Sequence, residues 1–400
     1  MGFDYDVIVV GAGPGGSMAA RFCSRAGLKT LLIEKEKMPR YKACGGCLSF
    51  KTVQLLGFDV SPVLENTINQ VKFTYRMKEP FSIESKQPMA FLVMRDRFDQ
   101  FLVKKTLDEG TTLLEGERVE GVEEKDGSVE VQLYKGKRIR CEYLIGADGA
   151  ESIVARSLSL LPPKGDGIGI ALESEIPFER TVDFPKEELH RIHLDFGRIP
   201  NGYGWMFPKR EGLSIGIGGM LTDGVKLSPR RYFGPFIKGL NYIHEGEVKK
   251  VIGHPLPPFY NEKQRVSKGR VLLVGDAAHL MDPLTGEGIY YAVRSGMLAG
   301  EAIVQSKEKG ILPSDHYQKA VHDHIFENLK WALAFSRFVF RFTRLAYQTL
   351  NRYPELGNFY IQVLEGRETY HGFATRVKER IKDLLKGRLN LKIIRAMAGV

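Results

Sequence analysis

The residues Tyr5–Val10 and Gly11–Gly16, which read YDVIVV and GAGPGG, decide the fold of the N-terminal part of the chain. The aliphatic run in the first segment is typical of a buried parallel strand. A helical pattern follows from Ser17 to Arg25, and Gly27 stands where a helix would end. Lys29–Glu34 (KTLLIE) predicts a second buried strand. Together these segments predict a βαβ unit.

The glycines of this unit match the G-x-G-x-x-G pattern of loops that bind dinucleotides. Gly11 permits a tight turn, Gly13 lets the backbone approach a pyrophosphate, and Gly16 allows close packing of helix on strand. The helix N-terminus adds free N–H groups and a positive dipole. Glu34 ends the second strand, where its carboxylate can accept hydrogen bonds from ribose hydroxyls. The loop alone does not separate FAD from NAD, and a glycine-rich turn without a ligand is the alternative.

Two later segments resemble the remaining cofactor motifs of the para-hydroxybenzoate-hydroxylase-like flavoproteins. The three motifs occur in the family's order, and the resemblance runs from about residue 5 to residue 305. It implies that the cofactor is FAD. The segments that carry it are Tyr143–Gly149 with Ser152 and Arg156, and Gly275–His279 with Pro283 and Gly286–Gly288.

Each of these motifs has a physical interpretation. Asp276 follows a buried strand, where a carboxylate can accept from the ribityl chain of FAD. Gly286 and Gly288 let backbone N–H groups approach the flavin or its phosphate. The resemblance places Asp148 near the cofactor. For both aspartates the alternative is the capping of a turn.

Within this superfamily the chain is similar to the geranylgeranyl reductase family. Three local features carry the similarity: Cys44-Gly45-Gly46 after the second strand, the run Arg95–Asp99, and the aromatic segment Gly202–Lys209. Members of this family reduce isolated double bonds of prenyl chains on lipids or pigments. The resemblance therefore implies that activity here.

The resemblance also suggests roles for Arg95 and Cys44. Arg95 would contact the cofactor, since a guanidinium suits pyrophosphate or flavin carbonyls, and its alternative is a surface ion pair with Asp96 or Asp99. Cys44 would lie near the isoalloxazine ring and gate access, relay a proton or pair reversibly with Cys47. The alternative for Cys44 is a small packed residue.

Tyr203, Trp205 and Phe207 alternate along the chain and so project from one face of a strand. They would line an apolar slot over the flavin for a prenyl tail, and a plain core face is the alternative. His254 and His279 receive no role. The predicted catalytic residues are thus Cys44, Tyr203 and Trp205, and no metal site is expected. The predicted cofactor-binding residues are Gly11, Gly13, Pro14, Gly15, Gly16, Glu34, Lys35, Cys44, Gly45, Arg95, Asp148, Gly149, Asp276, Pro283, Gly286, Gly288 and Ile289.

These motifs predict an α/β fold with a Rossmann-type FAD-binding domain (glutathione-reductase-like), an inserted β-sheet substrate domain and a C-terminal helical region. We expect the discontinuous FAD-binding domain to comprise residues 1–70, 90–160 and 265–320. The substrate domain would comprise 71–89 and 161–264, because the stretch from Gly167 to His254 is mostly strand-like. Residues 321–400 would be helical.

Composition and charge bear on the location and partners of the protein. The 400 residues carry a net charge of +10, concentrated in the tail Arg376–Arg395. Trp331–Tyr353 alternates aromatics with arginines, as in a helix that closes a tunnel or rests on an anionic membrane. The alternative is a packed C-terminal helix whose arginines extend to solvent. Nothing indicates a nucleic-acid-binding fold. With no signal peptide and no apolar run of about 18 residues, we expect a cytoplasmic protein that is either soluble or peripheral at the inner face of the membrane. The pair Cys44/Cys47 lacks the second pair of a zinc site.

Three functions of different classes remain open. The first is a prenyl reductase that uses an external donor: ferredoxin, a reduced deazaflavin or NAD(P)H. The second is a flavin monooxygenase or halogenase, although Tyr203 and Phe207 replace two residues of the halogenase W-x-W-x-I-P segment. The third is a non-enzymatic escort for prenylated partners. Oxygen-dependent turnover would favour the second, and purification without flavin the third.

Overall fold

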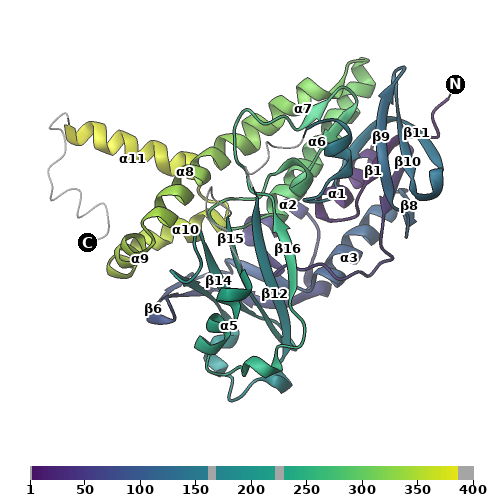
Figure 1. Cartoon of the computed structure of the whole chain (residues 1–400). Helices are drawn as coiled ribbons and strands as arrows, with labels where there is room; N and C mark the ends of the chain where they lie inside the picture. The colour runs from purple at the N-terminus through teal and green to yellow at the C-terminus, as the bar shows by residue number, and fades with distance from the viewer. Residues whose placement is uncertain (1, 161–167, 221–228, 386–400) are drawn as a thin grey trace.

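A computed structural model describes residues 2–160, 168–220 and 229–385. Three regions share the molecule (Figure 1): a mostly parallel sheet with flanking helices, a second and largely antiparallel sheet, and a set of C-terminal helices. The predicted α/β fold class is confirmed. The predicted domain boundaries stay a prediction.

The first sheet contains the strands of the dinucleotide motif. Five of its strands are hydrogen-bonded side by side and parallel, in the order β18-β11-β1-β2-β8. The core around it is mostly aliphatic, which is typical of a parallel sheet covered on both faces. The strands are β1 (Tyr5–Val10), β2 (Thr30–Glu34), β8 (Thr112–Glu115), β11 (Arg138–Gly146) and β18 (Val271–Leu273), with β9 (Val119–Lys125), β10 (Ser128–Leu133) and β17 (Ser267–Lys268) as antiparallel additions.

Two helices pack closely behind the glycine-rich loop. Helix α1 (Pro14–Arg25) lies against α6 (Ile289–Lys309), although Ile289 follows Arg25 by 264 positions in the sequence. Glycines make the contact close: a Cβ on Gly296 would lie 2.2 Å from the carbonyl oxygen of Gly15. Helix α3 (Arg95–Leu107) packs on α1 as well. The third cofactor motif is thereby held beside the first.

The second sheet has seven strands and lies outside the dinucleotide-type region. Its order is β16-β12-β15-β14-β13-β5-β6, antiparallel throughout except for the β13·β5 pair. Helix α5 (Pro229–Gly239), which the sequence did not predict, covers one face. The strands are β5 (Gln70–Tyr75), β6 (Lys78–Glu84), β12 (Gly169–Pro177), β13 (Arg191–Phe196), β14 (Gly202–Pro208), β15 (Gly212–Met220) and β16 (Ile252–Leu256).

A small third sheet links the two larger ones. It has the order β3-β7-β4, with β3 (Cys47–Ser49), β4 (Leu64–Ile68) and β7 (Ala90–Val93). Helix α2 (Phe50–Leu56) follows β3 directly, and its contact with α6 ties this sheet to the cofactor domain. The loop that carries Cys44 enters the sheet at β3, so its position is fixed on one side by strand pairing.

The C-terminal region is helical, as predicted, but it is broken where a single helix was expected. Trp331–Tyr353 is divided between α8 (Glu327–Arg341) and α9 (Thr343–Arg352), because Phe342 adopts φ −121° and ψ 42°. Tyr347 of α9 is buried on the second sheet, and its hydroxyl donates to the carbonyl of Phe73 at 3.2 Å. Helices α7 (Pro313–Val321), α10 (Asn358–Leu364) and α11 (Tyr370–Leu385) complete the region. The basic tail beyond residue 385 lies outside the described residues.

Candidate active site

A large cavity of about 1610 Å³ lies where the three regions meet. Its walls come from the carboxyl ends of the first sheet, one face of the second sheet and the C-terminal helices. Every residue predicted for the site lines this cavity except Gly16. Ligands bind at the carboxyl edge of parallel sheets, so this is the expected location for a cofactor.

The glycine-rich loop has the geometry that its sequence predicts. Gly11 adopts φ +102°, and a Cβ there would lie 2.3 Å from the carbonyl oxygen of Ala147. Gly16 is a packing residue, because its Cβ would lie 1.8 Å from the carbonyl oxygen of Gly11. A Cβ on Gly13, by contrast, would have only the Arg40 side chain nearby, at 3.9 Å. The open space over Gly13 at the N-terminus of α1 suits a pyrophosphate.

Glu34 is buried beside this loop and already has hydrogen-bond donors. Its Oε2 accepts from the N–H of Ala12 at 3.0 Å and lies 3.2 Å from Nε of Arg40, and its Oε1 accepts from the N–H of Glu36 at 3.2 Å. The carboxylate therefore fixes the shape of the loop. Its predicted contact with a ribose stays a prediction.

Arg95 makes an ion pair, but the pair is buried rather than at the surface. Its Nε and one Nη atom each lie 2.9 Å from an oxygen of Asp99, a two-pronged contact at the start of α3. Arg40 adds a third contact to Asp99 at 2.9 Å. The alternative pair with Asp96 is wrong, since the Asp96 side chain accepts from the N–H of Arg97. Because Arg95 also lines the cavity, the contact with Asp99 orients it there.

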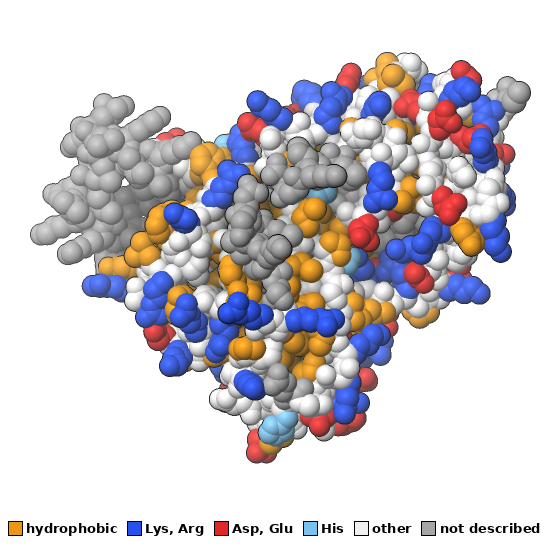
Figure 2. Space-filling model, in the orientation of Figure 1, with side chains coloured by type: hydrophobic (Ala, Val, Ile, Leu, Met, Phe, Trp, Pro, Cys, Tyr) orange, Lys and Arg blue, Asp and Glu red, His pale blue; other side chains and the backbone are white. Residues whose placement is uncertain are grey.

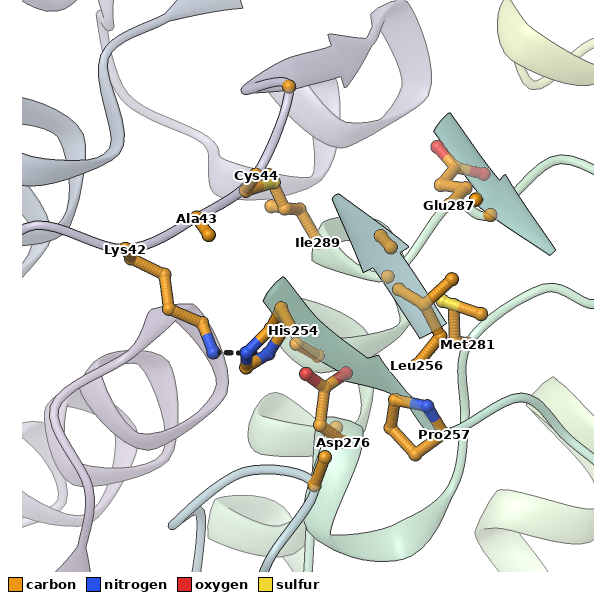
Figure 3. A pocket seen from close by; sticks show the side chains of 18 of the residues that line it. Lys42, Ala43, Cys44, His254, Leu256, Pro257, Asp276, Met281, Glu287 and Ile289 are labelled. Carbon is orange, nitrogen blue, oxygen red and sulfur yellow. Dashed lines mark hydrogen bonds between the residues drawn. The ribbon is translucent and has the colours of Figure 1, made fainter. Parts of the chain in front are cut away.

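The two motif aspartates differ in their surroundings. Asp148 accepts from Ser152 Oγ at 2.6 Å and from the N–H of Ile153 at 2.7 Å, so it caps helix α4 (Ile153–Ser157). Burial raises the pKa of this carboxyl group. Asp276 lies in the short 3-10 turn Gly275–Ala278, and within the described ranges its carboxylate accepts no hydrogen bond. It is directed into the cavity (Figure 3), as an acceptor for a bound polyol would be.

A lysine–histidine pair beside Asp276 was not predicted. Lys42 Nζ lies 2.6 Å from His254 Nε2, across a separation of 212 residues (Figure 3). Burial lowers the pKa of Lys42, and burial together with the Lys42 charge lowers the pKa of His254 to about 4. Nothing in the sequence pattern signalled this pair, since only the pairing of β16 with β12 brings His254 to the cavity.

The Cys44 segment is held by a buried carboxylate that also escaped prediction. Oε2 of Glu173, on β12, accepts from the N–H of Cys44 at 2.8 Å. Cys44 and Cys47 are both free thiols, and burial raises the pKa of Cys47 to about 12. Their reversible pairing stays a prediction. Gly45 lies under the aromatic strand, because a Cβ there would be 2.6 Å from the ring of Phe207.

The aromatic residues of β14 stand in a row on the cavity wall. The ring centroids of Tyr203 and Trp205 are 6.4 Å apart, and those of Trp205 and Phe207 are 6.3 Å apart. Tyr203 donates its hydroxyl hydrogen to the carbonyl oxygen of Thr285, which joins the row to the third cofactor motif. Trp205 Nε1 is buried and finds no partner in the described part of the chain. The row is a cavity wall rather than a plain core face.

Glu287, between the two motif glycines Gly286 and Gly288, is a further residue that the sequence left unassigned. It accepts a hydrogen bond from Ser49 and forms an ion pair of 2.7 Å with Lys51. Lys51 Nζ also lies 4.3 Å from the ring centre of Tyr290. These contacts fasten the glycine turn to the start of α2, so Glu287 has a clear structural role.

Comparison with known proteins agrees with this geometry. Residues 4–210 and 260–308 match the family model described as FAD binding domain. A digeranylgeranylglycerophospholipid reductase of Methanopyrus kandleri is 31% identical over 335 residues, which is 76% of this chain and 82% of the relative. The corresponding reductase of Methanococcus vannielii is 28% identical over 98% of this chain and 95% of its own. A menaquinone reductase of Mycolicibacterium smegmatis is 30% identical over 74% of this chain and 75% of its own.

Solved structures show the same fold. A geranylgeranyl bacteriochlorophyll reductase-like protein of Thermoplasma acidophilum superposes with a TM-score of 0.76 at 26% identity, covering 87% of this chain and 90% of its own. A flavin-dependent brominase reaches a TM-score of 0.69 at 21% identity, covering 95% of this chain and 99% of its own. The likeness to the brominase extends to the fold alone.

The open loop at Gly13, the unpartnered carboxylate of Asp276 and the cavity between them fit FAD. The fold and the site therefore define an FAD-dependent oxidoreductase. Among these enzymes, the chain belongs to the geranylgeranyl reductase family.

Proposed function

We propose that this protein saturates C=C bonds in the prenyl chain of a lipid or isoprenoid. The observation that carries the proposal is the apolar extension of the cavity beyond the aromatic row of β14. Side chains of the second sheet and of the C-terminal helices line this extension, which we call the slot. Its apolar lining includes Phe73, Ile83, Ile192, Leu194, Phe335, Val339, Phe340, Leu350, Phe359 and Tyr360.

Such a slot suits a branched hydrocarbon chain. Burying prenyl methyl and methylene groups against these side chains contributes roughly 25 cal/mol per Å² of apolar surface. The same side chains exclude water and hold the alkene near Cys44, Tyr203 and Trp205, which we propose as the residues that contact it. When bound and reduced, FAD supplies a hydride to one alkene carbon.

The names of the relatives support the substrate class. Digeranylgeranylglycerophospholipid and menaquinone differ in their polar parts but both carry a prenyl chain. A site that recognises the chain rather than the head group fits an extended apolar slot. The electron donor would be ferredoxin, a reduced deazaflavin or NAD(P)H.

We also propose a peripheral membrane contact, because a prenyl lipid must leave the bilayer to enter the slot. Within the described ranges, no helix is long and apolar enough to span a membrane. The outer surface of α8 and α9, however, carries exposed apolar side chains, Phe338, Phe342 and Leu345, next to Arg337 and Arg341. Figure 2 shows hydrophobic and basic side chains intermixed there. This combination is typical of surfaces that rest on anionic lipid.

The direct test is mass spectrometry of a prenyl lipid after anaerobic incubation with the dithionite-reduced holoprotein. Products heavier by pairs of hydrogens are expected. Parallel incubations with a geranylgeranyl phospholipid and with menaquinone would identify the polar part that the site accepts.

A further inference from the structure

Each double bond that receives a hydride also consumes one proton, and an apolar slot does not supply one. If the proposed function holds, that proton must reach the alkene by another path. Two glutamates of β12 lie among the residues that hold the Cys44 segment: Glu173 is buried and Glu175 is half-buried. Neither has a role in the packing of an apolar core. Alternate residues of a strand share one face, so both side chains project toward the same segment.

Glu173 occupies the cavity end of this pair. Its side chain lines the cavity, and only 2% of its surface is exposed. Its Oε2 accepts from the Tyr41 hydroxyl at 3.2 Å as well as from the N–H of Cys44, and its Oε1 accepts from Ser214 Oγ at 2.9 Å. Tyr41 also lines the cavity and is 47% exposed. A single carboxylate thus bridges β12 to the loop that faces the ligand space.

Glu175 occupies the solvent end. It is outside the cavity lining, and 26% of its side-chain surface is exposed. The charge of Glu173 adds to the raised pKa of Glu175, which indicates that the two carboxyl groups lie close together. Lys209 Nζ, itself buried, lies 2.7 Å from Glu175 Oε1. Glu175, Glu173 and the Tyr41 hydroxyl therefore form a row of neighbouring groups that can exchange protons, from the partly exposed Glu175 to the cavity.

We propose that Glu175, Glu173 and Tyr41 carry a proton from solvent to the alkene that the site reduces. As the hydride forms a C–H bond at one alkene carbon, the O–H bond of Tyr41 breaks and its proton forms the second C–H bond. The π electrons of the alkene are consumed in this second bond. Protonated Glu175 passes its proton to the Glu173 carboxylate as Glu173 passes one to the Tyr41 oxygen, and solvent then reprotonates Glu175. The net input is one hydride and one proton for each double bond.

The charges around the chain agree with this direction of transfer. Burial raises the pKa of Glu175 to about 7; the Lys209 ammonium opposes the shift and the Glu173 carboxylate adds to it. Glu175 can therefore gain and lose a proton near neutral pH. Burial, followed by the charges of Glu173 and Glu175, raises the pKa of Tyr41 well above its ordinary value. The Tyr41 anion is therefore unfavourable, and a proton from Glu173 restores the hydroxyl.

The test uses the reduced holoprotein and a geranylgeranyl phospholipid under anaerobic conditions, with flavin reoxidation followed across pH. The wild-type rate should fall as pH rises through about 7, the pKa of Glu175. Glu175→Gln should slow reoxidation about tenfold or more at pH 6 and abolish that pH dependence, because a positioned acid contributes roughly 10²–10⁴-fold to such a step. Glu175→Asp, which retains an acid, should restore a pH-dependent rate. Tyr41→Phe should slow flavin reoxidation to a similar extent as Glu175→Gln.

The matched control is Glu211→Gln, a change of an exposed glutamate in the turn after Lys209 that should leave the rate unchanged. A second readout needs no turnover: infrared titration of flavin-free protein should show a carboxyl band lost near pH 7 in the wild type and absent in Glu175→Gln. The relay is overturned if Glu175→Gln binds FAD normally and keeps the wild-type rate and pH profile. If wild-type protein itself leaves every prenyl lipid unreduced, the proposed function is wrong instead.

Discussion

Lys42 Nζ lies 2.6 Å from His254 Nε2, and this contact joins the segment after β2 to the edge strand of the second sheet. It places two groups with lowered pKa values beside Asp276, at the seam between the cofactor region and the second sheet (Figure 3). We therefore expect this seam to respond to protonation.

Replacing His254 tests this sensitivity. Burial and Lys42 lower the pKa of His254 from 6.5 to about 4, so the folded protein binds fewer protons than the unfolded chain between those values. The stability that the neutral imidazole contributes is present above pH 6.5 and is lost as pH falls through 4. The difference in unfolding free energy between wild type and His254→Gln should grow in favour of the wild type from pH 4 to 6.5. Urea denaturation at several pH values measures it. The same substitution at exposed His316 should show no such trend, and a flat difference for His254 would contradict the prediction.

Two glycines of the same loop should respond differently to a methyl group. Gly13 is in an extended conformation (φ −76°, ψ −177°) with free space beyond its Cα, so Gly13→Ala should fold normally. Its methyl group would occupy the pyrophosphate space, and we expect FAD affinity to fall about tenfold or more. Gly16→Ala should instead lower the melting temperature of flavin-free protein, because its Cβ meets the Gly11 carbonyl at 1.8 Å. Calorimetry and flavin titration separate the two effects. Equal thermal destabilisation by both changes would be inconsistent with this geometry.

The slot between the second sheet and α8 should limit chain length. Val339 lines the cavity, whereas the adjacent Phe338 is 55% exposed. Val339→Trp should lower kcat/KM for a geranylgeranyl substrate more than for a shorter prenyl substrate, since added volume blocks the slot. Phe338→Trp is the control at the adjacent exposed position and should change neither value. An equal fall in kcat/KM for the long and the short substrate would contradict a slot whose depth limits chain length.

The outer face of α8 and α9 should bind membranes. Replacing Phe338, Phe342 and Leu345 by serine together should weaken binding to anionic phosphatidylglycerol vesicles about tenfold or more, because apolar burial and basic residues act jointly there. Ile311 and Leu312 are equally exposed but lie before α7, and their replacement by serine should leave binding unchanged. Vesicle co-sedimentation provides the measurement. If both sets of replacements weaken vesicle binding equally, the effect comes from general surface hydrophobicity and not from the face of α8 and α9.

The cofactor region was predictable because its chemistry depends on local sequence. A strand, a glycine turn and a helix follow one another at Tyr5–Arg25, and backbone geometry alone explains Gly11 and Gly16. The aromatic row of β14 was predictable for the same reason, since alternation along one strand fixes a common face.

The groups that complete the site could not be predicted, because each depends on contacts between distant segments. Glu173 reaches Cys44 across 129 residues and His254 reaches Lys42 across 212. The break at Phe342 also escaped prediction, since α8 and α9 bury different faces against tertiary neighbours and no proline or glycine marks the boundary.

The central claim is that reduced protein transfers hydrogen to a prenyl chain. Its most direct measurement is mass spectrometry of a geranylgeranyl phospholipid after anaerobic incubation with dithionite-reduced holoprotein, with dithionite and free FAD as the blank. The account predicts products heavier by one or more pairs of hydrogens, formed as the protein-bound flavin is reoxidised. Unchanged lipid, with the flavin still reduced and with menaquinone also unreacted, would contradict it.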